Sequence, residues 1–234
     1  MPPVVTAALA SLVVLLAVGA GAWWRERGQR RTSPMAGGLH SDRSLPHEQE
    51  WELHHNSFSL CSKKLRVCLA ELGLDYASRP VELIETGAYQ NIGREFLAVN
   101  PAGLVPVLVH RGHPIYESHE QIVYAARHAG DAGRALHPEE AERRAVVEEW
   151  TDRASLVGDP LAGLEGRAGH CIPGLTVPLF ASMVQYIPWM RFGEGLLFHP
   201  DKRRPLFLAL LKQRGVARLP GPVRALVARS RDAM

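Results

Sequence analysis

The stretch Leu53-His-His-Asn-Ser-Phe-Ser-Leu-Cys61-Ser-Lys-Lys-Leu-Arg-Val-Cys-Leu-Ala-Glu-Leu-Gly73 predicts a strand, a short serine-rich loop and a helix. Leu65, Cys68, Leu69 and Leu72 recur at the spacing of one helical face. Gly73 is typical of the residue after a helix end, because glycine accepts a positive φ without a steric penalty. The stretch therefore predicts a helix that begins near Cys61 and ends before Gly73.

Cys61 is a candidate nucleophile because of its place at the start of this helix. Ser59 or Ser62 is suited to cap the helix, and free amide N–H groups and the positive end of the helix dipole meet there. That setting favours a thiolate, which is the reactive form of cysteine. Taken alone, the same residues also fit a purely structural helix start with a small residue beside its serine caps.

The three cysteines, Cys61, Cys68 and Cys171, do not form a disulfide framework and indicate a reducing compartment. Cys61 and Cys68 lie two helical turns apart, about 10 Å along the axis, which is too far for a bond. Lys64 stands where a C-x-x-C pair would have its second cysteine, so a local dithiol cycle is excluded. His170-Cys171 provides too few ligands for a metal site, and none is predicted.

The first 24 residues carry no charged side chain and end in Trp23-Trp24, after which Arg25, Arg27, Arg30 and Arg31 follow. About 20 apolar residues cross a hydrocarbon core, tryptophans favour the interface, and arginines favour the cytoplasmic side. Residues 1–24 are therefore predicted to be an uncleaved, single-pass transmembrane anchor with the main domain in the cytoplasm. A cleaved signal peptide is the alternative, but it would carry positive charge before its apolar region.

Residues 25–49 are rich in Gly, Ser, Pro and charge without periodicity, which predicts a flexible linker. Charge is unevenly spread along the rest of the chain. Residues 191–234 carry 10 basic and 3 acidic side chains, whereas residues 51–190 carry 12 and 17. The basic end fits a solvated tail or contact with an anionic membrane surface, and no nucleic-acid partner is predicted.

Residues 50–130 predict the order β-α-β-α-β-β-α. The strands are expected at Trp51–His55, Tyr76–Leu83, Leu104–Val109 and Pro114–Tyr116, and the further helices at Ala88–Val99 and from Glu117-Ser118 to about His128. Ser118 and Gln121 have the spacing of a capping box. Pro106 inside an apolar strand indicates an edge position or an X-Pro bond of special geometry.

Three motifs in this region resemble glutathione transferases. Ser59-Leu-Cys61-Ser resembles their nucleophile loop, Asn100-Pro-Ala-Gly-Leu-Val105-Pro106 resembles their cis-proline loop, and Glu117-Ser118 resembles their γ-glutamyl-binding pair. The S-x-C-S loop is similar to that of the zeta class and of tetrachlorohydroquinone dehalogenases. The resemblance implies an α/β thioredoxin-like N-terminal domain, an all-α C-terminal domain, glutathione as the bound thiol, and compatibility with a homodimer.

The resemblance also assigns roles. Val105, followed by a cis bond to Pro106, would pair its backbone with glutathione as an added strand. Ser118 would hold the γ-glutamyl carboxylate at a helix N-terminus, and Glu117 would accept from the ammonium group. Ser59 or Cys61 would face the glutathione sulfur, and the sequence leaves open which of the two leads. His54 and His55 are predicted to be structural.

Residues 137–234 resemble the family less closely. His137-Pro-Glu-Glu predicts a helix start with proline near its first position and acids in its first turn. The usual capping motif of the family's helical domain is missing. Residues 171–190 are uncharged but hold Pro173, Pro178 and Pro188, so an ordinary spanning helix is not expected. A helical core, a substrate wall and a surface that enters the bilayer all remain open. Residues 205–212 and 222–229 predict two basic amphipathic helices.

The sequence thus predicts a membrane-anchored, glutathione-dependent transferase-like enzyme that acts on a small apolar electrophile by conjugation, isomerisation or reductive removal of a group. The alternative is a non-catalytic module of the same fold that binds or tethers a partner at the membrane. The retained Ser59, Cys61, Val105-Pro106 and Glu117-Ser118 favour glutathione binding, whereas the atypical second domain favours the alternative.

Overall fold

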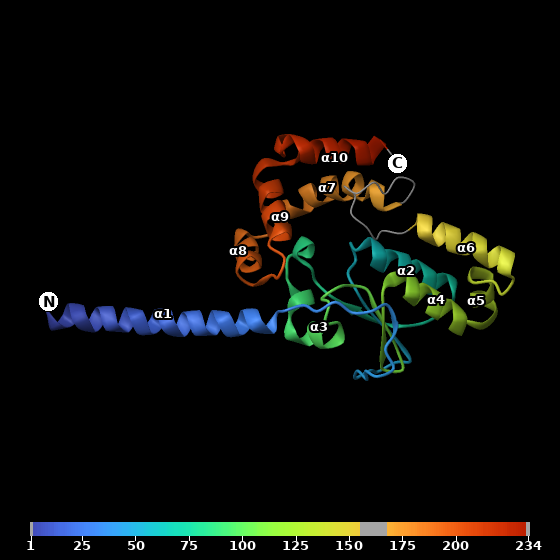
Figure 1. Ribbon diagram of the computed structural model, residues 1–234, viewed down its shortest axis with the longest axis horizontal. Coiled ribbons are helices and arrows are strands. Elements are labelled where there is room, and N and C mark those ends of the chain that lie inside the picture. Colours follow the sequence, from blue (N-terminus) through green and yellow to red (C-terminus); the bar gives the residue numbers. More distant parts are fainter. Residues whose placement is uncertain (1, 155–167, 233–234) are drawn as a thin grey trace.

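A single long helix projects from a two-part body (Figure 1). The computed structural model describes residues 2–154 and 168–232, and most of α1 (Pro3–Gln29) extends away from the body, which only the end of this helix contacts. In the described part, α1 is the helix that is long and apolar enough to cross a membrane, with a mean hydropathy of 2.4 and none of that window buried. Its length and composition are also those of a signal sequence.

The centre of the body is a mixed sheet with the strand order β1-β5-β4-β2-β3. β2 and β3 run parallel, and every other neighbouring pair runs antiparallel. Parallel neighbours need a crossover, which α2 provides between β2 and β3. The elements are β1 (Gly38–Leu39), β2 (Trp51–His55), α2 (Leu60–Glu71), β3 (Ala77–Pro80), α3 (Arg94–Val99), β4 (Val107–His110), β5 (His113–Tyr116) and α4 (Ser118–His128).

Helices cover both faces of the sheet. α2 and α4 pack Leu65, Leu69 and Ala125 against Leu53, Leu108 and Ile115 of the sheet. Their neighbours along the strands point the other way, so Val107, Val109 and Tyr116 pack with Phe96 of α3. This alternation follows from the two-residue period of a strand. The expected order β-α-β-α-β-β-α is therefore confirmed by the structure.

The segment expected to be a linker is partly ordered. α1 continues through Arg25 to Gln29, and residues 38–39 form β1 on the open edge of β5. Ser33 N–H donates to the Pro101 carbonyl at 2.8 Å, and Met35 and Leu45 pack against the core. An edge strand leaves its backbone groups unpaired, and β1 satisfies part of that edge.

Some element boundaries also differ from expectation. The second strand is shorter, because the chain leaves β3 at Pro80 and turns into a 3-10 segment, Ile84–Thr86. The helix expected over residues 88–99 breaks at Gly93 into a 3-10 turn, Gln90–Ile92, and α3. The third strand begins at Val107 rather than Leu104, because Pro106 has no N–H with which to extend the ladder.

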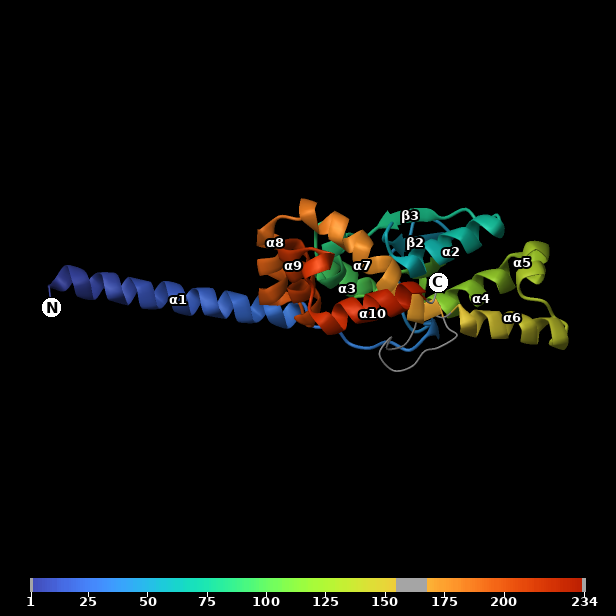
Figure 2. The same cartoon turned by 90° about the horizontal axis from the view of Figure 1, so that it is seen from above.

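Two helices follow α4 before the gap in the described residues. α5 (Gly130–Leu136) was not expected, and α6 (Ala141–Arg153) begins three residues after Pro138 with Glu140 at its cap. The expectation that Pro138 lies near the first position of this helix is therefore wrong. Pro138 lies instead in the connection between the end of α5 at Leu136 and the start of α6 at Ala141. Figures 1 and 2 show α6 at the end of the body far from α1.

The C-terminal helices form a second core beside the sheet. α7 (Ile172–Met183), α8 (Trp189–Phe198), α9 (Arg203–Arg214) and α10 (Gly221–Asp232) follow one another, with a 3-10 turn, Val184–Tyr186, before α8. α7 and α8 are bent by 111° at the break between them. Phe192, Leu208 and Leu211 are fully buried there together with Ile84 and Ile92 from the sheet side. The helices expected over residues 205–212 and 222–229 are confirmed as α9 and α10.

Candidate active site

The start of α2 holds both predicted thiol-facing residues. Ser59 is the N-cap, and its Oγ accepts a hydrogen bond from Ser62 N at 3.2 Å. Because the Oγ is the acceptor, the hydroxyl hydrogen of Ser59 stays available for a ligand. Ser62 is buried and accepts from Asn56 N at 3.3 Å, so Ser59 rather than Ser62 caps the helix. Cys61 is the second residue of α2 and is half-buried.

The loop before β4 has the expected cis bond between Val105 and Pro106. Side-chain amides hold this loop: Asn100 Nδ2 donates to the Leu104 carbonyl at 2.8 Å, and Asn91 Nδ2 donates to the Gly103 carbonyl at 2.9 Å. Val105 makes no backbone–backbone hydrogen bond to any described residue. Its N–H and C=O are therefore free to pair with an extended, peptide-like ligand.

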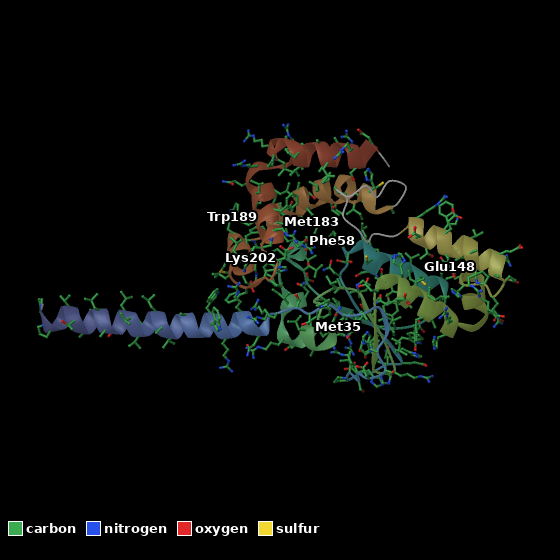
Figure 3. The ribbon with its side chains drawn as sticks, viewed as in Figure 1. Met35, Phe58, Glu148, Met183, Trp189 and Lys202 are labelled. Carbon is green, nitrogen blue, oxygen red and sulfur yellow. The ribbon has the colours of Figure 1, made fainter. Side chains whose placement is uncertain are left out.

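Ser59, Cys61 and Val105 line one cavity of about 280 Å³ between the two halves of the body. Phe58, which Figure 3 labels near the meeting point of the two halves, also belongs to its wall. α7 contributes Ile172, Thr176 and Phe180. The remaining lining residues are Asn56, Leu60, Leu83, Glu85, Asn91, Gly103, Leu104 and Arg204.

Glu117 and Ser118 lie at the N-terminus of α4 rather than in the wall of this cavity. Ser118 is buried as the first residue of α4, and Glu117 is exposed as its N-cap with a φ of 64°. The expected capping box is wrong, because Gln121 instead donates from Nε2 to the carbonyls of Pro106 and Ile115. Gln121 thereby connects the start of α4 to the cis-proline loop through a hydrogen bond.

Lys64 connects the two parts of the site, although the sequence did not assign it a role there. Burial lowers the pKa of its ammonium group, while the nearby charges of Cys61 and Glu117 act in the opposite direction. Its Nζ lies 3.4 Å from His119 Nε2. The signal that would have found it is spacing, since residues three apart on a helix share a face and Lys64 follows Cys61 by three.

An ion pair between buried Glu85 and exposed Arg204 lies in the wall of the cavity. Glu85 is only 4% exposed, and Arg204 of α9 donates from Nε to its Oε1 at 2.6 Å. The other oxygen, Oε2, has no hydrogen-bond partner among the described residues. Glu85 and Arg204 are 119 positions apart, so no local pattern in the sequence could have paired them.

Other candidate groups are structural. Burial raises the pKa of the Cys68 thiol to about 11, which keeps it protonated at neutral pH. His55 forms a 2.8 Å hydrogen bond between Nε2 and Ser78 Oγ, and His54 packs against Phe96. Burial lowers the pKa of both imidazoles, and neither lines the cavity. In the described ranges, no three His, Cys, Asp or Glu side chains gather as a metal site would require.

Comparison with known proteins agrees with this arrangement. Residues 58–128, which hold α2, the cis-proline loop and the start of α4, match the family described as glutathione S-transferase, N-terminal domain. This stretch thus resembles the N-terminal domain of glutathione S-transferases. The matched residues include Ser59, Cys61, Val105, Glu117 and Ser118.

The relatives extend the comparison only in part. The chain is 33% identical over 98 residues to glutathione S-transferase 1 of Dianthus caryophyllus, which is 42% of each protein. It is 33% identical over 106 residues to maleylacetoacetate isomerase of Rattus norvegicus, covering 45% of this chain and 48% of the isomerase. The chain thus matches less than half the length of these relatives.

A solved structure resembles a larger part of the fold. The beta-etherase from Sphingobium sp. strain SYK-6 aligns with a TM-score of 0.56 over 79% of this chain and 69% of its own, at 19% identity. The likeness supports a shared glutathione S-transferase fold, with a thioredoxin-like part and further helices.

Proposed function

We propose that this protein is a membrane-anchored, glutathione-dependent enzyme that acts on a small apolar electrophile. One observation carries the proposal: the Ser59 hydroxyl, Cys61 and the unpaired backbone of Val105 face a single cavity. A thiol peptide needs a backbone partner and a group at its sulfur, and these residues provide both within the glutathione S-transferase N-terminal domain.

Val105 and the start of α4 would hold glutathione. The free N–H and C=O of Val105 suit the backbone of an extended peptide. Ser118 and the first N–H groups of α4 suit a carboxylate, because orphan donors and the positive end of the helix dipole meet there. Glu117, exposed beside them, provides a carboxylate for the ligand's ammonium group.

We assign the leading chemical role to Cys61, with Ser59 in support. Ser59 donates its free hydroxyl hydrogen to a bound thiolate while it caps α2. Cys61, beside the Lys64 cation, attacks the sulfur of a glutathione–substrate thioether. A sulfur–sulfur bond forms, the bond between sulfur and the substrate carbon breaks, and that carbon takes a proton. The Cys61 disulfide is then cleaved by a second glutathione thiolate, which leaves oxidised glutathione.

The rest of the cavity suits an apolar partner for the thiol. Phe58, Leu104, Ile172 and Phe180 provide carbon surface around the reacting groups. Arg204 is the cation in the cavity wall, where it is already paired with Glu85. A neutral or weakly polar molecule therefore fits better than a strongly anionic one, whose charge would compete with Glu85 for Arg204.

Paired variants in the full chain test this assignment. With glutathione and a halogenated hydroquinone, Cys61→Ser should abolish reductive removal of halogen, because a hydroxyl is a poor nucleophile at neutral pH. Ser59→Ala should lower turnover less, and Ser59→Asn, which keeps a capping side chain, separates the loss of the hydroxyl from the loss of the cap. The reverse order, with Ser59 essential and Cys61→Ser mild, would assign conjugation or isomerisation instead. The name of the maleylacetoacetate isomerase relative makes isomerisation a direct comparison assay.

α1 supports the proposed anchor, with the N-terminus outside and the body in the cytoplasm. Its apolar stretch ends at Trp23-Trp24 and the arginines that follow, as interface and cytoplasmic residues do. Full-length protein should stay in the membrane fraction after a high-pH carbonate wash. Release into the supernatant would refute the anchor, and loss of residues 1–24 from the purified protein, found by mass spectrometry, would identify a signal peptide.

A non-catalytic tethering module remains a second candidate, because the relatives match less than half of their length and the helices of residues 168–232 lie outside the matched domain. It predicts glutathione binding by calorimetry with no turnover of any electrophile. Cys61→Ser would then change neither measurement.

A further inference from the structure

The helix α8 has two apolar faces, of which only one is buried. Phe192 and Gly195 face the second core, and Phe192 is among its fully buried side chains. On the outer side of α8, Trp189 is 55% exposed and Met190 76% exposed, and Leu196 and Leu197 are exposed beside them. These four residues, called here the α8 face, lie at i, i+1, i+7 and i+8, which is one side of a helix. The Trp189 ring borders the buried face, since its centre lies 5.5 Å from that of Phe192.

The α8 face lies directly beside the end of α1. Trp23 donates from its indole N–H to the Leu197 carbonyl at 3.3 Å, and Arg30 donates to Glu194 at 3.1 Å. The Arg30 guanidinium also lies 4.9 Å from the ring centre of Phe198. α8 is therefore fixed at the level along α1 where the apolar stretch ends and the arginines begin.

That level determines what surrounds the α8 face when α1 spans a bilayer. The apolar residues before Trp23 would occupy the hydrocarbon, and Trp23 and Trp24 would lie at the interface with the headgroups. Because Leu197 touches Trp23, α8 would lie at the same depth. Figure 3 shows Trp189 and Lys202 at the end of the body from which α1 projects, whereas Glu148 of α6 lies at the opposite end.

Cations surround the same place. A cavity of about 290 Å³ between α1 and the end of α8 is lined by Arg27, Arg30 and Arg31 together with Trp24, Gly28, Phe198 and Pro200. The ammonium nitrogen of Lys202 is buried without a hydrogen-bond partner among the described residues. Burial and the nearby charge of Arg27 lower the pKa of Lys202. An anion in this cavity would relieve the repulsion between these cations.

We propose that α8 is a second membrane contact, whose exposed apolar face lies in the headgroup–acyl boundary while Arg27 and Arg31 bind the phosphates of anionic lipids. The inference rests on the proposed anchor, since α1 determines the depth of α8. An apolar helix face with adjacent cations is the composition of an interfacial helix. A lipid surface therefore fits the position and the charge better than a second copy of this basic region.

Quenching of tryptophan fluorescence by brominated acyl chains tests the contact. The full chain is reconstituted in vesicles of phosphatidylcholine and phosphatidylglycerol whose acyl chains carry bromine near the headgroup. Trp189→Phe should remove roughly a third of the quenched emission, because Trp189 would be one of three interfacial tryptophans with Trp23 and Trp24. Trp150→Phe is the matched control, since Trp150 is 62% exposed but lies on α6, and it should leave the quenched emission unchanged.

The result that overturns the inference is distinct from failure of the anchor. Resistance to carbonate extraction with equal quenching in Trp189→Phe and wild type would refute the α8 contact and leave the anchor intact. Extraction by carbonate would refute both. Protection of Trp189 from acrylamide without quenching by brominated lipid would show a protein cover, such as a second copy, and would also overturn it.

A separate double variant tests the proposed contacts between arginines and lipid phosphates. Arg27→Gln together with Arg31→Gln leaves the α8 face and the catalytic cavity untouched. In vesicles, phosphatidylglycerol should increase the quenching of wild-type Trp189 relative to phosphatidylcholine alone, and the double variant should lose this increase. An equal response in both proteins would refute the phosphate contacts.

Discussion

The two halves of the body meet at one cavity but provide different chemistry to it. The sheet half, residues 51–128, provides Ser59, Cys61 and the backbone of Val105, all able to hold or attack a thiol. The helical half, residues 168–232, provides Ile172, Thr176 and Phe180, with Arg204 already paired to Glu85. Under the proposed function, the first half would bind and activate the thiol, whereas the second would determine which molecule meets it.

One segment of the sheet half packs into the core of the helical half and so joins the two. Residues 84–92 lie between β3 and α3, yet Ile84, Tyr89 and Ile92 are part of the core formed by α7 to α9. Arg204 reaches back to Glu85 in the same segment. The wall of the cavity is therefore fixed to the sheet rather than free to move apart from it.

The largest expected effect separates the two cysteines of α2. With its pKa raised to about 11 from an ordinary 9.0, Cys68 should hold roughly 100-fold less thiolate than an ordinary cysteine near neutral pH. Buried Cys68 should therefore be alkylated by iodoacetamide much more slowly than half-buried Cys61. Mass spectrometry of the labelled peptides across pH 6 to 9 measures both rates.

A control variant shows whether the site itself contributes to this reactivity. Lys64→Gln should slow labelling of Cys61 and leave Cys68 unaffected, because only Cys61 lies beside the Lys64 charge. Equal and slow labelling of Cys61 and Cys68 in the wild type would show that the sheet half has no activated thiol.

The next effect tests the joint between the halves. A Cβ on Gly195 of α8 would overlap the Tyr89 hydroxyl and lie 2.8 Å from Pro205 Cβ. Gly195→Ala should thus lower the free energy of unfolding by about 1–3 kcal/mol through overpacking. Gly193, two residues earlier, meets nothing within 4 Å, and Gly193→Ala should leave stability unchanged or raise it by up to about 1 kcal/mol. Urea unfolding of both variants measures the difference, and equal stabilities would mean that Tyr89 does not pack there.

The smallest expected effects distinguish the glutathione site from the site of the apolar substrate. Ser118→Ala should weaken glutathione binding by about 1–2 kcal/mol, because the carboxylate loses a hydroxyl partner at the start of α4. Phe180→Ala should leave that affinity unchanged but raise the KM of the apolar substrate by roughly 5- to 30-fold, about 1–2 kcal/mol of lost apolar contact. Calorimetry and steady-state kinetics measure the two constants. If either variant changed both the glutathione affinity and the KM of the apolar substrate, the two halves would not bind separate ligands.

Prediction from the sequence succeeded where the information is local. The apolar spacing of α2, the serine cap at Ser59 and the proline turn at Val105-Pro106 each depend on neighbouring residues, and the structure has all three. Ser59, Cys61 and Val105 are moreover in one cavity, as the motifs implied. The proposed placement of Glu117 and Ser118 around a ligand stays a prediction.

What could not be predicted depends on contacts between distant residues. β1 exists because residues 38–39 pair with β5, although two residues have no periodicity to detect. α5 is seven residues long and contains two glycines, so its sequence favours a turn over a helix. Of the alternatives left open for residues 171–190, core packing and a cavity wall are both observed, because α7 places Val177 in the core and Phe180 at the cavity.

The short connection between α1 and the sheet would affect how the protein meets a substrate in a membrane. Only residues 30–37 separate the end of α1 from β1, and Ser33 is bonded to Pro101 along the way. On the proposed anchor, a body tied so closely could not tumble freely, so its motion would reduce to lateral diffusion and spin about the membrane normal. The mouth of the cavity then stays at a constant height above the lipid. For the proposed enzyme, encounters with a lipid-dissolved substrate would become a search in two dimensions, with less orientational entropy to lose on capture.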